Sequence, residues 1–183
     1  MAKVLVPLAP GFEELEAITI IDLLRRAGFD VITAGLDDKP VTASRRNVII
    51  PDTQISAIMH EAFDLIVLPG GLPGADHLRD DANVQSLIRK QSEKNGKIGA
   101  ICAAPRALAS AGVLDGKTIT CYPGALDQID SSSFAISGQA VETDGNITTS
   151  RGPGTAMDFA LELIGQLGGN DLREQIAAQM VRD

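Results

Sequence analysis

The chain has 183 residues, a net charge of −8, 44% hydrophobic residues and only 3% aromatic residues. The acidic balance and the few aromatic side chains argue against general nucleic-acid binding, and no apolar stretch is long enough to span a membrane. With two cysteines and no signal peptide, the sequence predicts a single domain over residues 1–183 of a cytoplasmic protein whose core needs no disulfides.

Short apolar runs alternate with helical segments along the chain. Strands are predicted near 3–8, 29–36, 63–71, 97–102, 117–121 and 146–150, and helices near 13–27, 55–61, 81–95, 105–111, 154–167 and 171–181. Near-continuous apolar strands between helices are typical of a mostly parallel sheet covered on both faces. Residues 38–51 and 132–145 carry turn signals, which predict hairpins outside the sheet. The predicted fold is a doubly wound α/β sandwich.

The helix predicted at 13–27 is apolar around most of its surface. Its polar positions form a narrow stripe: Glu16, Thr19, Asp22 and Arg26. So wide an apolar surface predicts burial against the sheet and against a second body, for which another subunit is the candidate. Desolvation within this surface should raise the pKa of Glu16, so that this carboxyl holds a proton.

Cys102 ends the run K-I-G-A-I-C (97–102), and Pro105 follows at a favoured first helical position. The thiol therefore lies on a strand-to-helix turn at the carboxyl edge of the sheet, where doubly wound folds bind ligands. Because a helix N-terminus stabilises an anion, the sequence predicts a nucleophile with a lowered pKa. The alternative is a small buried core residue. Cys121 lacks such a setting and is predicted to be structural.

The remaining motifs give weaker evidence for a chemical function. V-L-P-G-G-L-P-G (67–74) follows a strand and either directs backbone N–H groups at an oxyanion or forms an ordinary turn. A-G-V-L-D-G-K-T (111–118) lacks the first glycine of a phosphate loop and lies between a helix and a strand in the wrong order, so a turn is predicted. The sequence contains no G-x-G-x-x-G, no G-x-S-x-G and no closely spaced Cys/His pair, so neither a cofactor nor a metal is expected.

Four motifs, in this order and at these separations, resemble the ThiJ/PfpI superfamily. They are G-F-E-E-L-E (11–16), V-L-P-G-G (67–71), A-I-C-A-A-P (100–105) and S-R-G-P-G-T (150–155). The likeness covers nearly the whole chain and is greatest to the branch of the parkinsonism-associated protein DJ-one and its bacterial relatives. It implies a flavodoxin-like sandwich, a homodimer, a nucleophile-elbow cysteine at Cys102 and a protonated carboxyl at Glu16.

The resemblance also implies where substrate and subunit contacts fall. Backbone N–H groups for an oxyanion would come from Gly70, Gly71 and Ala103. Arg45 matches an arginine that approaches the neighbouring subunit's site. Arg151, like Pro153, would lie near the pocket and the dimer seam.

The sequence departs from the family at Tyr122, which stands where many relatives have a histidine. Tyrosine is a poor base at neutral pH, so a Cys–His dyad is not expected, and proton transfer would depend on Glu16. Protease activity is therefore disfavoured, because peptide cleavage needs a proton donor for the leaving amine. His77 remains a possible substitute for the missing histidine.

The resemblance implies cofactor-independent chemistry on reactive dicarbonyls or their protein adducts, of the glyoxalase or deglycase kind, in carbonyl and oxidative stress. Cys102 would add to an aldehyde, Glu16 would move the proton, and water would release a hydroxy acid. The alternative is a redox-sensing or chaperone-like stress protein whose Cys102 oxidises to sulfinate without significant turnover. Both hypotheses use one site, so the sequence leaves both open.

Overall fold

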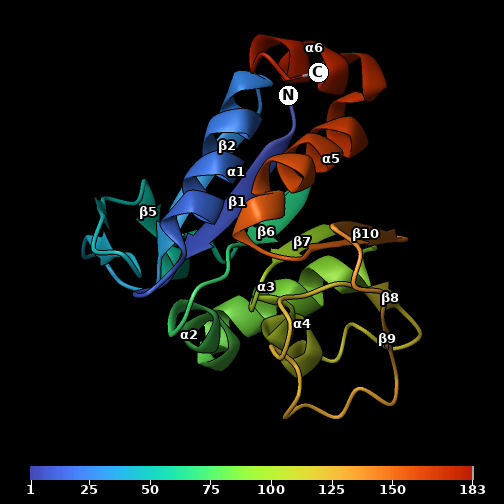
Figure 1. Cartoon of the computed structure of the whole chain (residues 1–183). Helices are drawn as coiled ribbons and strands as arrows, with labels where there is room; N and C mark the ends of the chain where they lie inside the picture. The colour runs from blue at the N-terminus through green and yellow to red at the C-terminus, as the bar shows by residue number, and fades with distance from the viewer. Residues whose placement is uncertain (183) are drawn as a thin grey trace.

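The computed structural model describes residues 1–182, and a seven-stranded sheet with strand order β10-β11-β7-β6-β1-β2-β5 forms its centre (Figure 1). Its strands are β1 (Lys3–Leu8), β2 (Asp30–Gly35), β5 (Thr53–Gln54), β6 (Leu65–Leu68), β7 (Lys97–Ile101), β10 (Val141–Asp144) and β11 (Ile147–Ser150). Neighbouring strands are parallel except for β10, which is antiparallel to β11. Every residue of β6 is buried, as expected for a strand covered on both faces.

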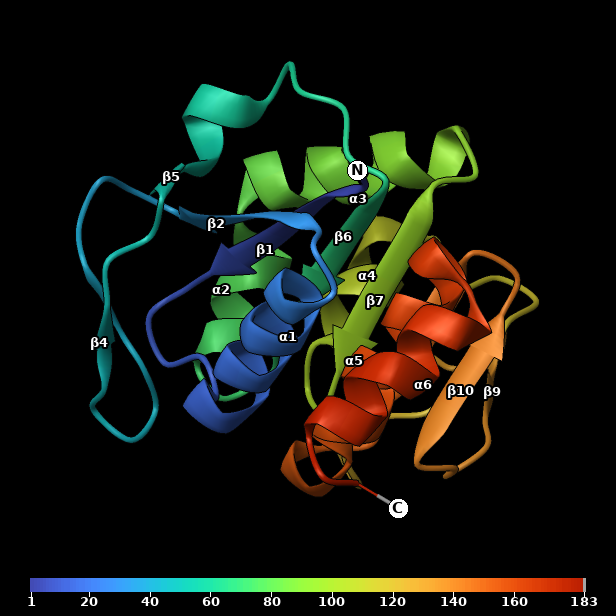
Figure 2. The same ribbon diagram turned by 90° about the horizontal axis from the view of Figure 1, so that it is seen from above.

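Helices cover both faces of the sheet, as Figure 2 shows from above. One face carries α1 (Glu14–Arg26), α5 (Ala156–Gly168) and α6 (Asn170–Gln179), and the other carries α2 (Gly74–Asp80), α3 (Ala82–Glu93), α4 (Pro105–Ala111) and the 3₁₀ helix η1 (Ile55–Ile58). Two hydrophobic cores result, one on each side of the sheet, with Phe12 and Phe159 fully buried in the first and Leu68 and Leu78 in the second. The predicted flavodoxin-like sandwich is confirmed.

Local signals placed several boundaries correctly. β1 and α4 have the predicted bounds, 3–8 and 105–111. Asp81 begins α3 by accepting hydrogen bonds from the backbone N–H groups of Asn83 and Val84, both at 2.9 Å. Gly28, which was expected to end the first helix, follows α1 with a φ of +81°.

The structure corrects three predictions. Helix α2 was not expected, because its glycine- and proline-rich start resembles a loop. The strand expected at 117–121 is the short β8 (Thr118–Ile119), which pairs with β9 (Ala135–Ile136) in a separate two-stranded sheet. Residues 132–145 do not form a hairpin outside the main sheet, because β10 joins its edge beside β11.

The other predicted excursion, at 38–51, is confirmed. β3 (Val41–Thr42) and β4 (Val48–Ile49) form a two-stranded antiparallel hairpin outside the main sheet. A second 3₁₀ helix, η2 (Pro153–Thr155), leads into α5. Within residues 1–182, none of the helices has both the length and the apolar character that a bilayer crossing requires.

Candidate active site

Cys102 directly follows β7 and adopts a φ of +63°, which costs an L-residue about 1–3 kcal/mol. Two backbone hydrogen bonds hold it in this conformation. Its N–H donates to the Ser150 carbonyl at 2.9 Å, and its own carbonyl accepts from the Tyr122 N–H at 2.9 Å. The predicted strand-to-helix turn is therefore present. Ser150 of β11 and Tyr122 support it, and the sequence did not reveal their contribution.

Glu16 lies in the first turn of α1 and has no exposed surface. The Gly70 N–H donates to Glu16 Oε2 at 2.8 Å, whereas Oε1 has no hydrogen-bond partner within the described chain. Burial raises the pKa of Glu16 to about 7, although the Gly70 hydrogen bond acts in the opposite direction. The predicted direction and its cause are both confirmed, and the carboxyl is poised to hold a proton near neutral pH.

Gly70 lies between Cys102 and Glu16, and its lack of a side chain leaves room for both. A Cβ atom at this position would lie 2.6 Å from the Cys102 Cβ and 2.7 Å from Glu16 Oε2, so only glycine fits. Because the Gly70 N–H binds Glu16, it does not point at an oxyanion beside the sulfur. The N–H groups that hydrogen-bond the sulfur are those of Gly71 and Ala103.

Burial raises the pKa of the Cys102 thiol to about 12, and the negative charge of Glu16 adds to this effect. The N–H groups of Gly71 and Ala103 act in the opposite direction but are outweighed. The prediction of a lowered pKa is therefore wrong while Glu16 is ionised, because desolvation of the thiolate exceeds the pull of the turn. Protonation of Glu16 removes the repelling charge and supplies a hydrogen-bond donor, so the two groups titrate as a pair.

Tyr122, Arg151 and Pro153 lie together, as the resemblance implied. They line a hollow of about 310 Å³ with Pro123, Gly152, Gly154 and Thr155. The hydrogen bond from the Tyr122 N–H to the Cys102 carbonyl ties one wall of this hollow to the cysteine. The Tyr122 side chain is 52% exposed.

His77 and Arg45 lie elsewhere, and no hydrogen bond or ion pair within residues 1–182 links either to Cys102 or Glu16. His77 Nδ1 is 2.9 Å from the Pro10 carbonyl, and the ring lines a different hollow of about 410 Å³. His77 therefore does not replace the family histidine in this structure. Arg45 is exposed on the loop between β3 and β4.

Glu14, in the first turn of α1, fixes this loop. Its carboxylate accepts hydrogen bonds from the Arg45 N–H at 2.9 and 3.0 Å, from Ser44 Oγ at 2.9 Å and from Asn47 Nδ2 at 2.9 Å. Burial acts to raise its pKa, but these donors outweigh burial and lower the pKa to about 2. The acceptor and its donors lie about thirty residues apart, so no local signal connects them.

The arrangement combines a thiol, a carboxyl that can carry a proton and two N–H groups that point at the sulfur. These are the parts needed for nucleophilic addition to a carbonyl group with proton transfer. Among residues 1–182, no three or more His, Cys, Asp or Glu side chains are grouped so as to hold a metal ion. Fold and site together define an α/β protein with a cysteine at a nucleophile elbow.

The chain belongs to the DJ-1/PfpI family, whose model matches residues 2–166. It is 44% identical to Protein dj-1beta of Drosophila melanogaster over 94% of this chain and 93% of that protein. It is 40% identical to the Parkinson disease protein 7 homolog of Danio rerio, covering 98% and 96% of the two chains. It is 34% identical to the glutathione-independent glyoxalase DJR-1.2 of Caenorhabditis elegans, covering 86% and 83%.

Solved structures agree with this assignment. The crystal structure of Drosophila melanogaster DJ-1beta superposes with a TM-score of 0.95 at 41% identity, covering 100% of this chain and 98% of that one. Oxidized Toxoplasma gondii DJ-1 superposes with a TM-score of 0.93 at 39% identity, covering 100% and 99%. The predicted family is confirmed.

Proposed function

We propose that the protein is a cofactor-independent, glyoxalase-type enzyme that converts reactive dicarbonyls to 2-hydroxy acids and so protects against carbonyl and oxidative stress. The observation that carries the proposal is the buried pair of Cys102 and Glu16, in which Glu16 Oε1 has no partner within the described residues. The name of the Caenorhabditis elegans relative, a glutathione-independent glyoxalase, supports the same reaction class. Action on protein adducts of the same aldehydes would need the same nucleophile.

The first step forms the carbon–sulfur bond. The Cys102 sulfur adds to the aldehyde carbon, and its proton passes to the new oxygen, which gives a hemithioacetal. The N–H groups of Gly71 and Ala103, which already point at the sulfur, stabilise the negative charge that develops on that oxygen. This step needs Cys102 without its proton, and the neighbouring Glu16 carboxylate is the nearest acceptor.

The second step moves hydrogen within the substrate. Glu16 takes the proton from the former aldehyde carbon and returns it to the neighbouring carbon, and the hydroxyl proton of the hemithioacetal moves to the former ketone oxygen. The aldehyde carbon is thereby oxidised to a thioester while the ketone carbon is reduced to an alcohol. Water then cleaves the thioester and releases the hydroxy acid and the free thiol. The sum is dicarbonyl plus water to hydroxy acid, with no external oxidant. A carboxyl with a pKa of about 7 suits both proton removal and return.

The test is turnover of methylglyoxal with D- and L-lactate quantified. Wild type should form lactate, Cys102→Ser should lose that activity, and the matched control Cys121→Ser should keep it, because Cys121 is the other free, buried cysteine and lies on the opposite core. Equal lactate formation by wild type and Cys102→Ser would overturn the proposal.

A second function is supported by the same buried pair of Cys102 and Glu16. The raised pKa of Cys102 slows aldehyde addition and peroxide attack alike, because both reactions use the thiolate. In a redox sensor, peroxide would oxidise the sulfur to sulfinate, with two peroxide molecules reduced to water. A protonated Glu16 and the two N–H groups would then hold the sulfinate oxygens. The description of the Toxoplasma gondii relative as oxidized supports this alternative. Intact mass after peroxide treatment separates the two: addition of two oxygens at Cys102, without lactate formation from methylglyoxal, would favour the sensor.

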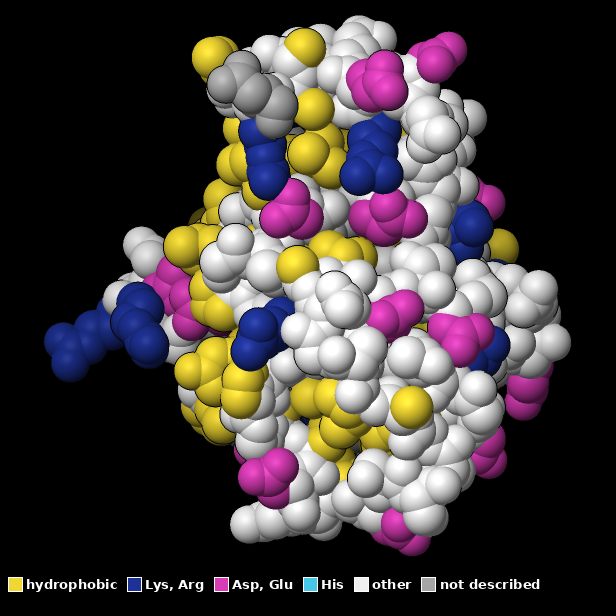
Figure 3. All heavy atoms as spheres, turned by 45° about the vertical axis from the view of Figure 1, so that its right-hand side comes forward, with side chains coloured by type: hydrophobic (Ala, Val, Ile, Leu, Met, Phe, Trp, Pro, Cys, Tyr) yellow, Lys and Arg dark blue, Asp and Glu magenta, His cyan; other side chains and the backbone are white. Residues whose placement is uncertain are grey.

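We also propose a homodimer, formed through an apolar patch made of Leu15, Ile18, Val48 and Ile50. These side chains are 44% to 80% exposed. In Figure 3, hydrophobic side chains gather along one flank of the molecule, beside projecting Lys and Arg side chains. Sedimentation should show a dimer for wild type and a monomer for Ile18→Glu, while Ile136→Glu, at a comparably exposed site elsewhere, should stay dimeric.

Two free cysteines suit the reducing cytoplasm, where we expect the protein to act.

A further inference from the structure

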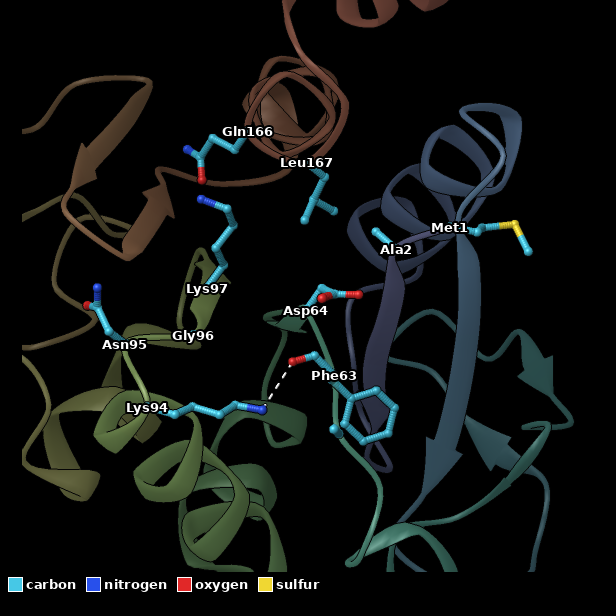
Figure 4. Close-up of a pocket in the computed structure, with 11 residues that line it drawn as sticks. Met1, Ala2, Phe63, Asp64, Lys94, Asn95, Gly96, Lys97, Gln166 and Leu167 are labelled. Atoms are coloured by element: carbon cyan, nitrogen blue, oxygen red, sulfur yellow. Dashed lines mark hydrogen bonds between the residues drawn. The ribbon is translucent and has the colours of Figure 1, made fainter.

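A second hollow, of about 720 Å³, opens at the amino ends of the central strands, opposite the edge that carries Cys102 (Figure 4). Lys97 is the first residue of β7, and Cys102 follows the last, so one strand connects the two locations. The eleven lining residues come from the segments just before β1 and β6, from the segment between α3 and β7 with the first residue of β7, and from the end of α5; they are Met1, Ala2, Ala62, Phe63, Asp64, Lys94, Asn95, Gly96, Lys97, Gln166 and Leu167.

The lining carries two lysines without carboxylate partners. Within residues 1–182, Lys90, Lys94 and Lys97 have no acidic side chain within ion-pair distance, whereas Lys3, Lys39 and Lys117 do. Of the three without such a partner, Lys94 and Lys97 line this hollow. Lys94 Nζ donates one hydrogen bond, to the Phe63 carbonyl at 3.2 Å, and an ammonium group has three donors. Asp64 is the only acidic residue of the described lining. The hollow is therefore net positive on a chain whose overall charge is −8.

Gln166 gives this end of the hollow a fixed polar wall. Three acceptors surround its Nε2, which has two N–H groups to donate: Thr148 Oγ1 at 2.8 Å, Thr143 Oγ1 at 3.1 Å and Glu162 Oε1 at 3.1 Å. Figure 4 shows the Lys97 ammonium group directed toward the side-chain oxygen of Gln166. Because acceptors surround the amide nitrogen, the oxygen is free to face the hollow, where Lys97 is half-buried.

The C-terminus of a helix explains the position of only one of the two lysines in the hollow. Lys94 follows the last residue of α3 and is favourably placed near the carbonyl end of that helix. Lys97 lies beyond the helix, at the start of a strand, so the helix dipole does not account for its position. Lys97 is only partly exposed, whereas Lys90 and Lys94 are both exposed.

We propose that this hollow binds a small organic anion, with a phosphate or carboxylate head group between Lys94 and Lys97. Ammonium groups act as compact, strongly hydrated point charges and suit such head groups. The Phe63 and Leu167 side chains provide apolar surface for the body of the ligand, and the volume lies in the usual range for small-molecule sites. This inference is independent of the chemistry at Cys102.

The test is an amide NMR titration of the full chain with phenyl phosphate, which joins an anionic head to an apolar body. We expect saturable shifts at Phe63, Gly96 and Lys97, with affinity reduced about tenfold in Lys97→Gln, since a charged hydrogen bond is lost. The matched control Lys90→Gln removes the same charge from the same part of the chain and should bind as wild type does. Inorganic phosphate alone should shift the same amides more weakly, because it lacks the apolar body.

A second variant, Lys94→Gln, covers the case in which Lys97→Gln does not fold, and its affinity should fall in the same direction. The proposal is overturned if no shift saturates, if the saturating shifts cluster around Gly71 and Cys102, or if Lys90→Gln weakens binding as much as the two test variants do. The last result would show a general effect of net charge and not a site.

Discussion

Glu14 and Glu16 lie two residues apart in the first turn of α1, are both buried, and have opposite environments. Glu14 accepts hydrogen bonds from three residues, and its pKa falls to about 2. Glu16 accepts one, from the Gly70 N–H, and its pKa rises to about 7. The dipole of α1 acts on both in the same direction, so it cannot separate them. Glu16 is completely buried and meets few donors, whereas Glu14 keeps 9% of its surface exposed and meets more of them, so burial and donors together decide the charge of each carboxyl.

This difference gives each carboxyl a different task. Glu14 stays ionised at all ordinary pH values and fixes the turn that carries Arg45. Glu16 keeps an unpartnered oxygen within the described chain and a proton that it can exchange near neutral pH, next to Cys102. Had the loop at residues 69–71 supplied further donors to Glu16, it would be a second permanent carboxylate, and proton exchange with Cys102 would be lost.

The largest expected effect is on turnover in Glu16→Gln. An amide can neither remove nor return a proton, so lactate formation from methylglyoxal should fall by about 10²–10⁴-fold. Glu14→Gln should reduce it far less, because Glu14 does not contact the sulfur. Steady-state kinetics on both variants tests the comparison. Equal losses in the two variants would mean that the pair acts through the structure of the first turn and not through proton transfer.

The next effect is on stability between pH 4.5 and 7. The folded-state pKa of Glu16 is raised from 4.5 to about 7, so native protein binds this proton more tightly than unfolded protein does. The stabilisation is complete below pH 4.5 and is lost as the pH rises through 7, at a cost of about 3 kcal/mol. Urea unfolding of wild type across this window should show the loss.

The control is Glu16→Gln, which has no proton to lose and should give a nearly flat stability profile over the same window. Cys102 does not interfere, because its thiol titrates near pH 12. A wild-type profile as flat as that of the variant would contradict the raised pKa.

Much of the fold followed from local signals, whereas the contrast between the two carboxyls did not. The bounds of α4 follow from Pro105, and the Cys102 turn from the end of an apolar strand, which are features of neighbouring residues. The charge of Glu14 depends on donors in the turn at 44–47, which is distant from it in sequence. The Cys102 pKa was predicted in the wrong direction for the same reason: burial comes from segments that only the fold brings together.

The same reasoning explains the smaller errors. β8 and β10 contain apolar and β-branched residues that suit any strand, and only tertiary pairing decides that β10 joins the main sheet while β8 does not. The raised pKa of Glu16 was predictable because a single helix already showed its apolar surroundings. The sequence is sufficient to predict a feature whose cause lies within one helix or strand. It is not sufficient where the cause depends on contacts between several of them.

A moderate effect is expected for Glu14→Gln. The pKa of Glu14 is lowered from 4.5 to about 2, so its stabilisation is present above pH 4.5 and is lost as the pH falls through 2. An amide turns a donor toward groups that are themselves donors, which should cost about 1–3 kcal/mol at neutral pH. Thermal or urea unfolding measures this cost, and the difference from wild type should shrink as the pH falls below 4.5. A cost that stays constant to pH 2 would indicate lost packing instead.

The smallest effect concerns Arg46, which has a φ of +76° in the turn that Glu14 holds, and whose side chain is exposed. Arg46→Gly relieves backbone strain of about 1–2 kcal/mol. It also costs about 0.5–1 kcal/mol, because glycine is more flexible in the unfolded chain. We therefore expect a net gain in stability of about 0.5 kcal/mol. In the Glu14→Gln background the turn is free to relax, and the gain should vanish. A double-mutant cycle measures this coupling. Equal stability gains in both backgrounds would show that the turn keeps its strained backbone without Glu14. The hydrogen bonds to Glu14 would then not be the cause of the turn conformation.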